Sequence, residues 1–156
     1  MSGQLSLDLI AAAQAALAKW DVPASVTLAQ YAWESGWGQH MPTGSFNPFG
    51  IKAKDGEPSV MAWTREVING QSLRVQAAFR AYPSFVEAFD DHGRLLATAP
   101  AYAPAMALWK STRDVFRFVP AVAVHYATDP NYSDSILEVI RQNHMTQYDV
   151  PGETGA

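Results

Sequence analysis

Apolar residues recur at helical spacing near the start of the chain. Leu9, Ala13, Leu17 and Trp20 fall on one face of a 3.6-residue period, and Ser6 stands where an N-cap is expected. The pattern predicts an amphipathic helix that packs its apolar face against the rest of the protein.

A second helix is predicted over PASVTLAQYAWES, which contains no helix breaker. Pro23 suits a first helical turn, and Asp21 is placed to cap it. Gly36 is expected to end the helix, because glycine readily adopts the left-handed conformation found there. Glu34 therefore falls in the last turn.

The pattern then changes from helical to extended. Residues 39–59 are rich in Gly, Pro, Asn and Ser, which indicates an ordered loop. Two β-rich runs follow on either side of Asn69-Gly70, the dipeptide most typical of a tight hairpin turn, so residues 59–82 are predicted to form a β-hairpin. A Ser-x-x-Glu capping box beginning at Ser84 then predicts a return to helix.

The C-terminal half is predicted to be helical. Two or three helices are expected, kinked or broken near Pro104 and Pro120, since proline disrupts a helix interior. The last clear helix is predicted from Ser133 to Asn143, and residues 151–156 are interpreted as a tail.

Composition narrows the classes of partner and cofactor. The chain has 156 residues, of which 48% are hydrophobic, enough for one domain with its own core. Its net charge of −4 gives no basic footprint for nucleic acid or a membrane surface. It has no cysteine, and none of its four histidines is spaced i, i+4 from another, so we expect no metal and no cofactor.

Glu34 is the strongest candidate for chemistry, because it lies between Trp33 and Trp37. Loss of water and the negative end of the helix dipole both favour the protonated carboxyl group. A carboxylic acid that stays protonated near neutral pH can serve as the general acid of glycoside hydrolysis. The alternative is a solvent-facing glutamate beside core tryptophans, and spacing alone does not decide between the two.

Glycoside hydrolysis also needs a second group, and Glu66 is the candidate. Strand alternation places it on the same face as Ala62 and Thr64. An exposed strand residue paired with Arg65 or Arg74 is the alternative, and the residues alone favour it.

Several motifs occur in one order over residues 20–143: PASVTLAQYAWESGWGQH, FNPFGIKA, TREVING, FRAYPSFVEAF and YATDPNYSDSILEVI. Together they resemble the peptidoglycan N-acetylglucosaminidases of glycoside hydrolase family 73. The resemblance implies an α+β fold, in which a mainly helical, lysozyme-like lobe and a small β-hairpin lobe flank a glycan-binding cleft. Residues 1–150 would form this single glucosaminidase domain.

The resemblance also implies roles for individual residues. It places the general acid at Glu34, the second acidic residue at Glu66 and a functional tyrosine at Tyr126. Two positions depart from the family pattern, Pro48 in place of leucine and His125 in place of glycine. Neither departure removes a catalytic group. Four further residues are candidates for binding substrate or orienting the acid: Gln30, Phe49, Trp63 and Tyr132.

The predicted activity is hydrolysis of the β-1,4 bond after N-acetylglucosamine in bacterial cell-wall glycan strands. Glu66 is interpreted as a general base or water-positioning group that approaches when the hairpin closes, while attack by the substrate's own N-acetyl group is the competing mechanism. A muramidase or lytic transglycosylase of similar fold is an alternative enzyme. A catalytically inactive peptidoglycan-binding module is the alternative from another class.

Location and partners follow from that substrate. The N-terminal segment lacks a basic start and carries Asp8 in its apolar part, unlike a signal peptide. We therefore expect action in the periplasm or cell wall after export or release by another route, as a phage lysin, a domain of an exported protein or an injected antibacterial effector. An effector would imply a cognate immunity or inhibitor protein. A monomer is expected.

Overall fold

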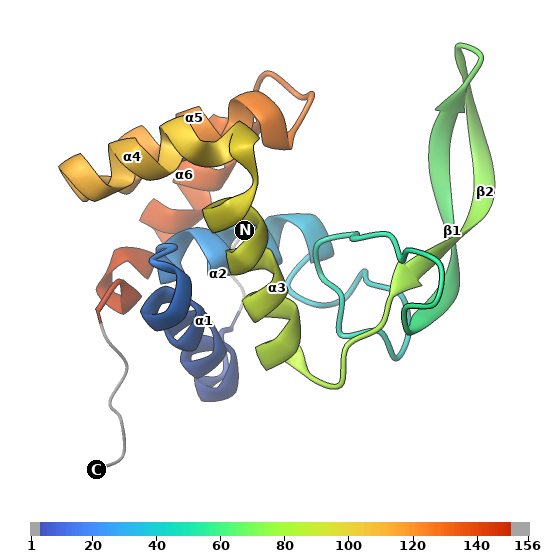
Figure 1. Ribbon diagram of the computed structural model, residues 1–156, viewed down its shortest axis with the longest axis horizontal. Coiled ribbons are helices and arrows are strands. Elements are labelled where there is room, and N and C mark those ends of the chain that lie inside the picture. Colours follow the sequence, from blue (N-terminus) through green and yellow to red (C-terminus); the bar gives the residue numbers. More distant parts are fainter. Residues whose placement is uncertain (1–3, 151–156) are drawn as a thin grey trace.

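Two lobes make up the protein, a bundle of helices and a long β-hairpin that projects from it (Figure 1). The structure is a computed structural model that describes residues 4–150. The α+β architecture predicted from the sequence is confirmed. In chain order the elements are α1 (Leu7–Trp20), α2 (Ala24–Ser35), β1 (Ser59–Ile68), β2 (Gln71–Arg80), α3 (Phe85–Thr98), the 3-10 turn η1 (Pro100–Tyr102), α4 (Ala103–Thr112), α5 (Val115–Tyr126), α6 (Tyr132–Gln142) and the 3-10 turn η2 (Met145–Tyr148).

Helix α2 is the centre of the helical lobe. It packs against α1, α3, α5 and α6, and every residue of it is buried except Trp33 and Glu34. The helix ends at Gly36 in the left-handed conformation, as predicted. A helix surrounded in this way holds its last turn in a fixed position relative to the core.

The ends of α1 and α2 confirm one predicted cap and correct another. Ser6 caps α1 by accepting a hydrogen bond from the Leu9 backbone N–H. The prediction that Asp21 caps α2 is wrong: Asp21 ends α1 in the left-handed conformation. The N-terminus of α2 is instead capped by Asp149, which accepts hydrogen bonds from the backbone N–H and hydroxyl of Ser25 at 2.7 and 2.6 Å. A residue far along the chain therefore does the capping.

The predicted hairpin is confirmed. β1 and β2 pair antiparallel from Ser59↔Arg80 to Ile68↔Gln71, and Asn69 and Gly70 both have positive φ, as the tight two-residue turn requires. Burial alternates along β1, and Ala62, Thr64 and Glu66 lie on the more buried face. The register therefore follows the expected alternation.

Asn47 organises the loop that joins α2 to the hairpin. Its side chain is fully buried, and its amide nitrogen donates to the carbonyls of Ile51 and Arg80 at 2.8 and 2.9 Å. Its side-chain oxygen accepts from the backbone N–H groups of Phe49 and Ile51. One side chain thus ties the loop to the end of β2.

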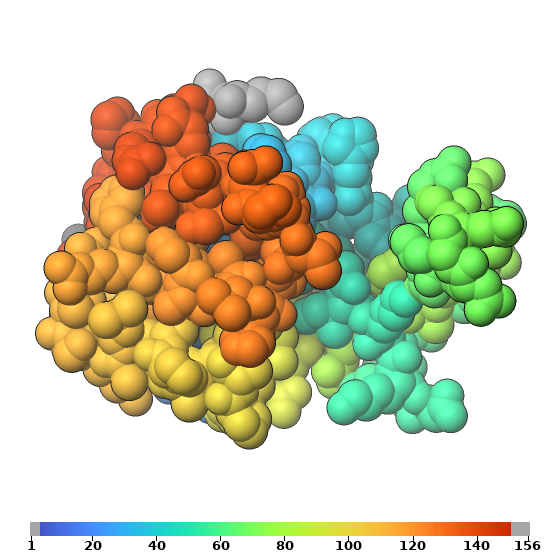
Figure 2. All heavy atoms as spheres, turned by 90° about the horizontal axis from the view of Figure 1, so that it is seen from above, coloured from blue at the N-terminus to red at the C-terminus, as the bar shows by residue number. Residues whose placement is uncertain are grey.

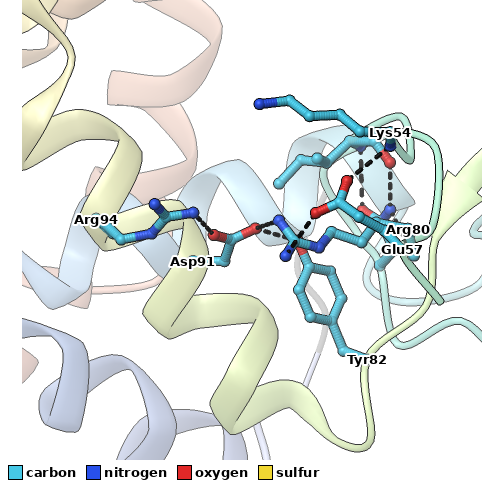
Figure 3. A network of polar contacts seen from close by, with 8 residues as sticks. Lys54, Glu57, Arg80, Tyr82, Asp91 and Arg94 are labelled. Atoms are coloured by element: carbon cyan, nitrogen blue, oxygen red, sulfur yellow. Dashed lines mark hydrogen bonds and ion pairs between the residues drawn. The ribbon is translucent and has the colours of Figure 1, made fainter.

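A polar network fastens the base of the hairpin to α3 (Figure 3). Arg80 reaches Glu57 at 2.8 Å and Asp91 at 2.9 Å, and the Tyr82 hydroxyl donates to Asp91 at 2.6 Å. Burial tends to raise the pKa of Asp91, but the hydrogen bonds from Tyr82 and Arg94 and the nearby Arg80 charge outweigh it and lower that pKa. The network fixes the hairpin at its base.

The C-terminal helices match the prediction except at one proline. Pro104 lies in the first turn of α4, after the break formed by η1, whereas Pro120 lies inside α5 and does not interrupt it. The last predicted helix is α6, shifted by one residue at each end. The predicted tail at 151–156 lies outside the described residues. None of the helices in the described part of the chain is long and apolar enough to cross a membrane.

Candidate active site

The side chain of Glu34 lines a cleft of about 830 Å³ between the helical lobe and the hairpin. Figure 2 shows the hairpin standing apart from the helical lobe across this groove. Trp33, Phe49, Trp63, Thr64 and Tyr132 are among the residues that share the cleft wall with Glu34. Glu34 is the only carboxylate among the described residues that line it.

The environment of Glu34 favours its protonated form. Burial raises the pKa of this carboxyl group to about 8, while hydrogen bonds from Tyr126 and Tyr132 act in the opposite direction. Desolvation dominates because taking a carboxylate out of water costs more than two hydroxyl donors recover. The group therefore carries a proton at neutral pH beside an open cleft, as a general acid must.

Two tyrosines hold this carboxyl group from the side of the core. The hydroxyl of Tyr126, at the end of α5, donates to Oε2 of Glu34 at 3.2 Å. Tyr132, at the start of α6, also hydrogen-bonds Glu34, and its ring stacks on Tyr126 with centroids 5.8 Å apart. Burial and the nearby Glu34 raise the pKa values of both tyrosines, so both hydroxyls remain donors. Of the two, only Tyr132 lines the cleft.

Gln30 lies one helical turn before Glu34 but does not reach the cleft. Its side chain is 1% exposed, and its amide bridges Tyr132 and His92. The structure therefore places Gln30 behind the acid, where it has no exposed surface to offer a sugar.

Phe49 and Trp63, the two aromatic candidates, both line the cleft but come from different parts of the chain. Phe49 comes from the Asn47 loop and is 7% exposed, with its ring stacked on His92. Trp63 comes from β1 and is 55% exposed, with the Arg74 guanidinium 4.5 Å from the centroid of its ring. Trp63 thus presents an accessible aromatic surface, whereas Phe49 mainly supports the wall.

Glu66 is not brought to the cleft wall. It lies near the free end of the hairpin, where it forms an ion pair with Lys52, and its side chain is 33% exposed. The ion-pair partner of Glu66 is therefore Lys52, and not Arg65 or Arg74. Within residues 4–150, no group of three or more His, Asp or Glu side chains is placed to hold a metal ion.

His92 is the site-related residue that sequence reasoning missed. It is fully buried on α3, on the same face as Ala88, Phe89 and Leu96. A histidine within an apolar helical stripe was the available signal, because a buried imidazole needs a polar partner. The sequence gives no indication that this partner is Gln30.

A helical lobe, a hairpin lobe and one protonated carboxyl group at the cleft between them define the class of lysozyme-like glycoside hydrolases. The chain matches the glucosaminidase family, described as mannosyl-glycoprotein endo-beta-N-acetylglucosaminidase, over residues 10–145. The chain belongs to this family, and the resemblance seen in its motifs is confirmed.

Individual relatives agree with this assignment. The chain is 39% identical to the autolysin of Enterococcus faecalis over 86% of its own length and 19% of that protein, and 37% identical to the peptidoglycan hydrolase FlgJ of Salmonella typhimurium over 78% and 40%. It therefore spans less than half the length of either relative. The catalytic domain of the Listeria monocytogenes autolysin Auto has a similar fold, with a TM-score of 0.80 and 26% identity over 96% of this chain and 91% of that one.

Proposed function

We propose that this protein hydrolyses the β-1,4 bond after N-acetylglucosamine in peptidoglycan glycan strands, with Glu34 as the general acid. The observation that carries the proposal is the position of Glu34 as the only carboxylate among the described cleft-lining residues, with its pKa raised by burial. Family membership supplies the substrate class, since autolysins and FlgJ are relatives.

In this mechanism Glu34 donates its proton to the departing glycosidic oxygen. Tyr126 and Tyr132 hold the carboxyl group and stabilise the carboxylate left after transfer, because both donate hydrogen bonds to it. The exposed ring of Trp63 offers a surface on which an apolar sugar face can stack. Phe49 supports the cleft wall from the Asn47 loop.

We assign Glu66 the role of general base or water-positioning group, reached when the hairpin closes over substrate. Supporting this are its place on the hairpin and its partly exposed carboxylate. An inverting reaction needs the two carboxyl groups roughly 6.5 to 9.5 Å apart, with water between them. Closure would have to separate Glu66 from Lys52 or move both together.

A second mechanism is favoured by the absence of another carboxylate among the described residues of the cleft wall. The N-acetyl group of the substrate would then attack its own sugar carbon while Glu34 protonates the leaving oxygen. Glu66→Ala plus azide separates the two mechanisms. Partial recovery of activity with an inverted glycosyl azide supports Glu66 as the base, whereas full activity of Glu66→Ala without azide supports attack by the N-acetyl group.

Mass spectrometry of the ends left after digestion of purified peptidoglycan tests the cleaved bond. New reducing N-acetylglucosamine ends are expected. Reducing N-acetylmuramic acid is the outcome that favours a muramidase, and a relative from Lactococcus lactis, 34% identical over 84% of this chain, is named a probable N-acetylmuramidase. Anhydro ends would identify a lytic transglycosylase, and no new ends at all would leave a binding module.

Glu34→Gln tests the acid in the same assay. The variant keeps the shape of the side chain and its ability to accept from Tyr126, but it has no proton to transfer. Loss of a general acid costs roughly a hundredfold to ten-thousandfold in rate. Glu66→Gln should be less damaging, and wild-type turnover in Glu34→Gln would refute the assignment.

The proposed site of action is the periplasm or cell wall, where the substrate lies, and the proposed state is a monomer. We propose that the protein reaches this site either by release as a lysin or by injection as an effector. If it is an effector, a cognate inhibitor protein would fill the cleft. Expression directed to the periplasm should lyse a bacterial host, whereas the same chain kept in the cytoplasm should not. Size-exclusion chromatography with light scattering tests the monomer.

A further inference from the structure

A hydrogen-bonded chain runs through the core from His92 on α3 to Glu34 on α2. Nε2 of His92 lies 2.7 Å from Oε1 of Gln30, and Nε2 of Gln30 donates to the Tyr132 hydroxyl at 3.0 Å. The Tyr132 hydroxyl in turn hydrogen-bonds Glu34. His92 and Gln30 are 0% and 1% exposed, so no solvent competes for the contact between them.

The protonation state of His92 decides which group donates and which accepts in each of these hydrogen bonds. Burial lowers the pKa of His92 to about 3, so its imidazole is neutral and carries one N–H. Oε1 of Gln30 can only accept, which places that hydrogen on Nε2 of His92. Nδ1 of His92 is the one buried side-chain nitrogen or oxygen among the described residues that has no hydrogen-bond partner. A bare acceptor nitrogen tolerates this better than an unpaired N–H donor does, so the hydrogen on Nε2 agrees with the surroundings of Nδ1.

Packing holds the imidazole in this orientation. The ring of Phe49 stacks on His92 with centroids 4.2 Å apart and planes at 21°. Tyr126 approaches from another side, with its ring centroid 6.2 Å from that of His92. The donor on His92 is therefore fixed by its surroundings.

We propose that His92 is a positioning residue, which orients the Gln30 carboxamide so that the Tyr132 hydroxyl must donate its hydrogen to Glu34. A carboxamide has one accepting and one donating end. Because His92 occupies the accepting end, Gln30 offers only an N–H group to Tyr132. The Tyr132 oxygen accepts that hydrogen bond, and its own hydrogen is left to be donated to Glu34. This inference rests on the proposed function only for its effect on turnover.

Loss of the His92 donor frees the carboxamide to turn over. Oε1 of Gln30 would then accept from Tyr132, and Glu34 would lose one of its two hydroxyl donors. Because that donor stabilises the carboxylate, its loss raises the pKa of Glu34 further. The other titratable groups near Glu34 are Tyr126 of α5 and Tyr102 of η1, with His40 on the loop that lines the same cleft.

The test is an NMR titration of ¹³C-labelled glutamate side chains in wild type and His92→Phe. His92→Phe keeps an aromatic ring against Phe49 and removes the donor. The Glu34 midpoint should rise by about one pH unit, because a hydrogen bond to a charged group contributes about 1.5 kcal/mol or more and one unit corresponds to about 1.4 kcal/mol. His92→Gln, which restores an N–H donor, should bring the midpoint back toward the wild-type value.

A double-mutant cycle tests the route through Tyr132. In a Tyr132→Phe background, His92→Phe should leave the Glu34 midpoint where Tyr132→Phe alone places it. The matched control is Phe118→Leu, which perturbs a fully buried residue outside the chain from His92 to Glu34 and should destabilise the protein without moving the midpoint. Chemical denaturation shows that each variant is folded at the titration temperature.

Each outcome decides one assignment. A midpoint in His92→Phe equal to that of wild type overturns the positioning role, and so does a shift that persists undiminished in the Tyr132→Phe background. The alkaline limb of the kcat/KM profile should move with the NMR midpoint. If the midpoint moves and the kinetic limb does not, His92 still positions Tyr132, and Glu34 fails as the general acid instead.

Discussion

Replacing Glu34 with glutamine should stabilise the fold, by an amount that grows as the pH rises. The carboxyl group has a pKa of about 8 in the folded protein because of burial, against 4.5 as its ordinary value. Between these two values the folded state holds a proton that the unfolded state has released. The free energy of unfolding of the wild type therefore falls across this window, and a glutamine, which does not titrate, escapes the loss.

The size of the effect follows from the two pKa values. Each pKa unit corresponds to about 1.4 kcal/mol, so the cost of the carboxyl group grows from about 1 kcal/mol near pH 5 to about 3 kcal/mol near pH 7, and levels off near 5 kcal/mol above about pH 9. These are upper figures, because the group is partly open to the cleft and solvent screens it. The same substitution should abolish turnover.

Urea unfolding of wild type and Glu34→Gln, followed by circular dichroism from about pH 5 to pH 9, measures this difference. Glu87→Gln is the matched control, because the Ser84 hydroxyl lowers the pKa of Glu87 and its contribution has the opposite sign. Because the pKa of Glu87 lies below its ordinary value of 4.5, its titration is complete at the acidic end of this range, and the difference between that variant and wild type should stay constant with pH. A difference between Glu34→Gln and wild type that stays constant with pH would show that the Glu34 carboxyl group has an ordinary pKa, and would refute the argument.

Three further predictions concern the surroundings of the acid. Tyr126→Phe removes a donor to Glu34 and should shift the alkaline limb of the kcat/KM profile upward. Asn47→Ala removes the side-chain partner of the Phe49 and Ile51 backbone N–H groups and of the Arg80 carbonyl, while the Ile51 carbonyl keeps the Arg80 N–H; it should cost roughly 2 to 4 kcal/mol in urea unfolding, with lower activity. Asp149→Ala removes the cap on Ser25 and should cost about 1 to 2 kcal/mol while the reducing ends of the product stay the same.

Local signals in the sequence predicted most of the fold. The helix cap at Ser6, the ending at Gly36 and the Asn69-Gly70 turn each depend on residues that are close in the chain, and all three are confirmed. The position of Glu34 in the last turn of α2 follows from the ending at Gly36. The family motifs of the chain then predicted the arrangement of the two lobes.

The features that were mispredicted or missed depend on residues far apart in the chain. Asp21 is of a residue type that commonly caps helices and precedes α2, but the residue that caps α2 is Asp149, 124 residues after Ser25. Likewise, no local pattern couples His92 to Gln30, because their contact depends on how α3 packs beside α2. The Lys52 partner of Glu66 depends on the path of the loop across the hairpin, which spacing along β1 does not encode.

The two carboxylates assigned to the reaction are held very differently, and this difference bears on the order of events. Glu34 belongs to a helix buried along its length, whereas Glu66 lies beyond the network that fastens the hairpin at its base. A proton donor of this kind is in place before substrate arrives, while a base near the free end of a two-stranded hairpin must be brought in. Binding energy from sugars that contact the hairpin, through Trp63 first, would then be used to position Glu66. Short glycans that do not reach Trp63 should consequently lose kcat as well as affinity, whereas substrate-assisted attack, which needs no closure, should leave their kcat unchanged.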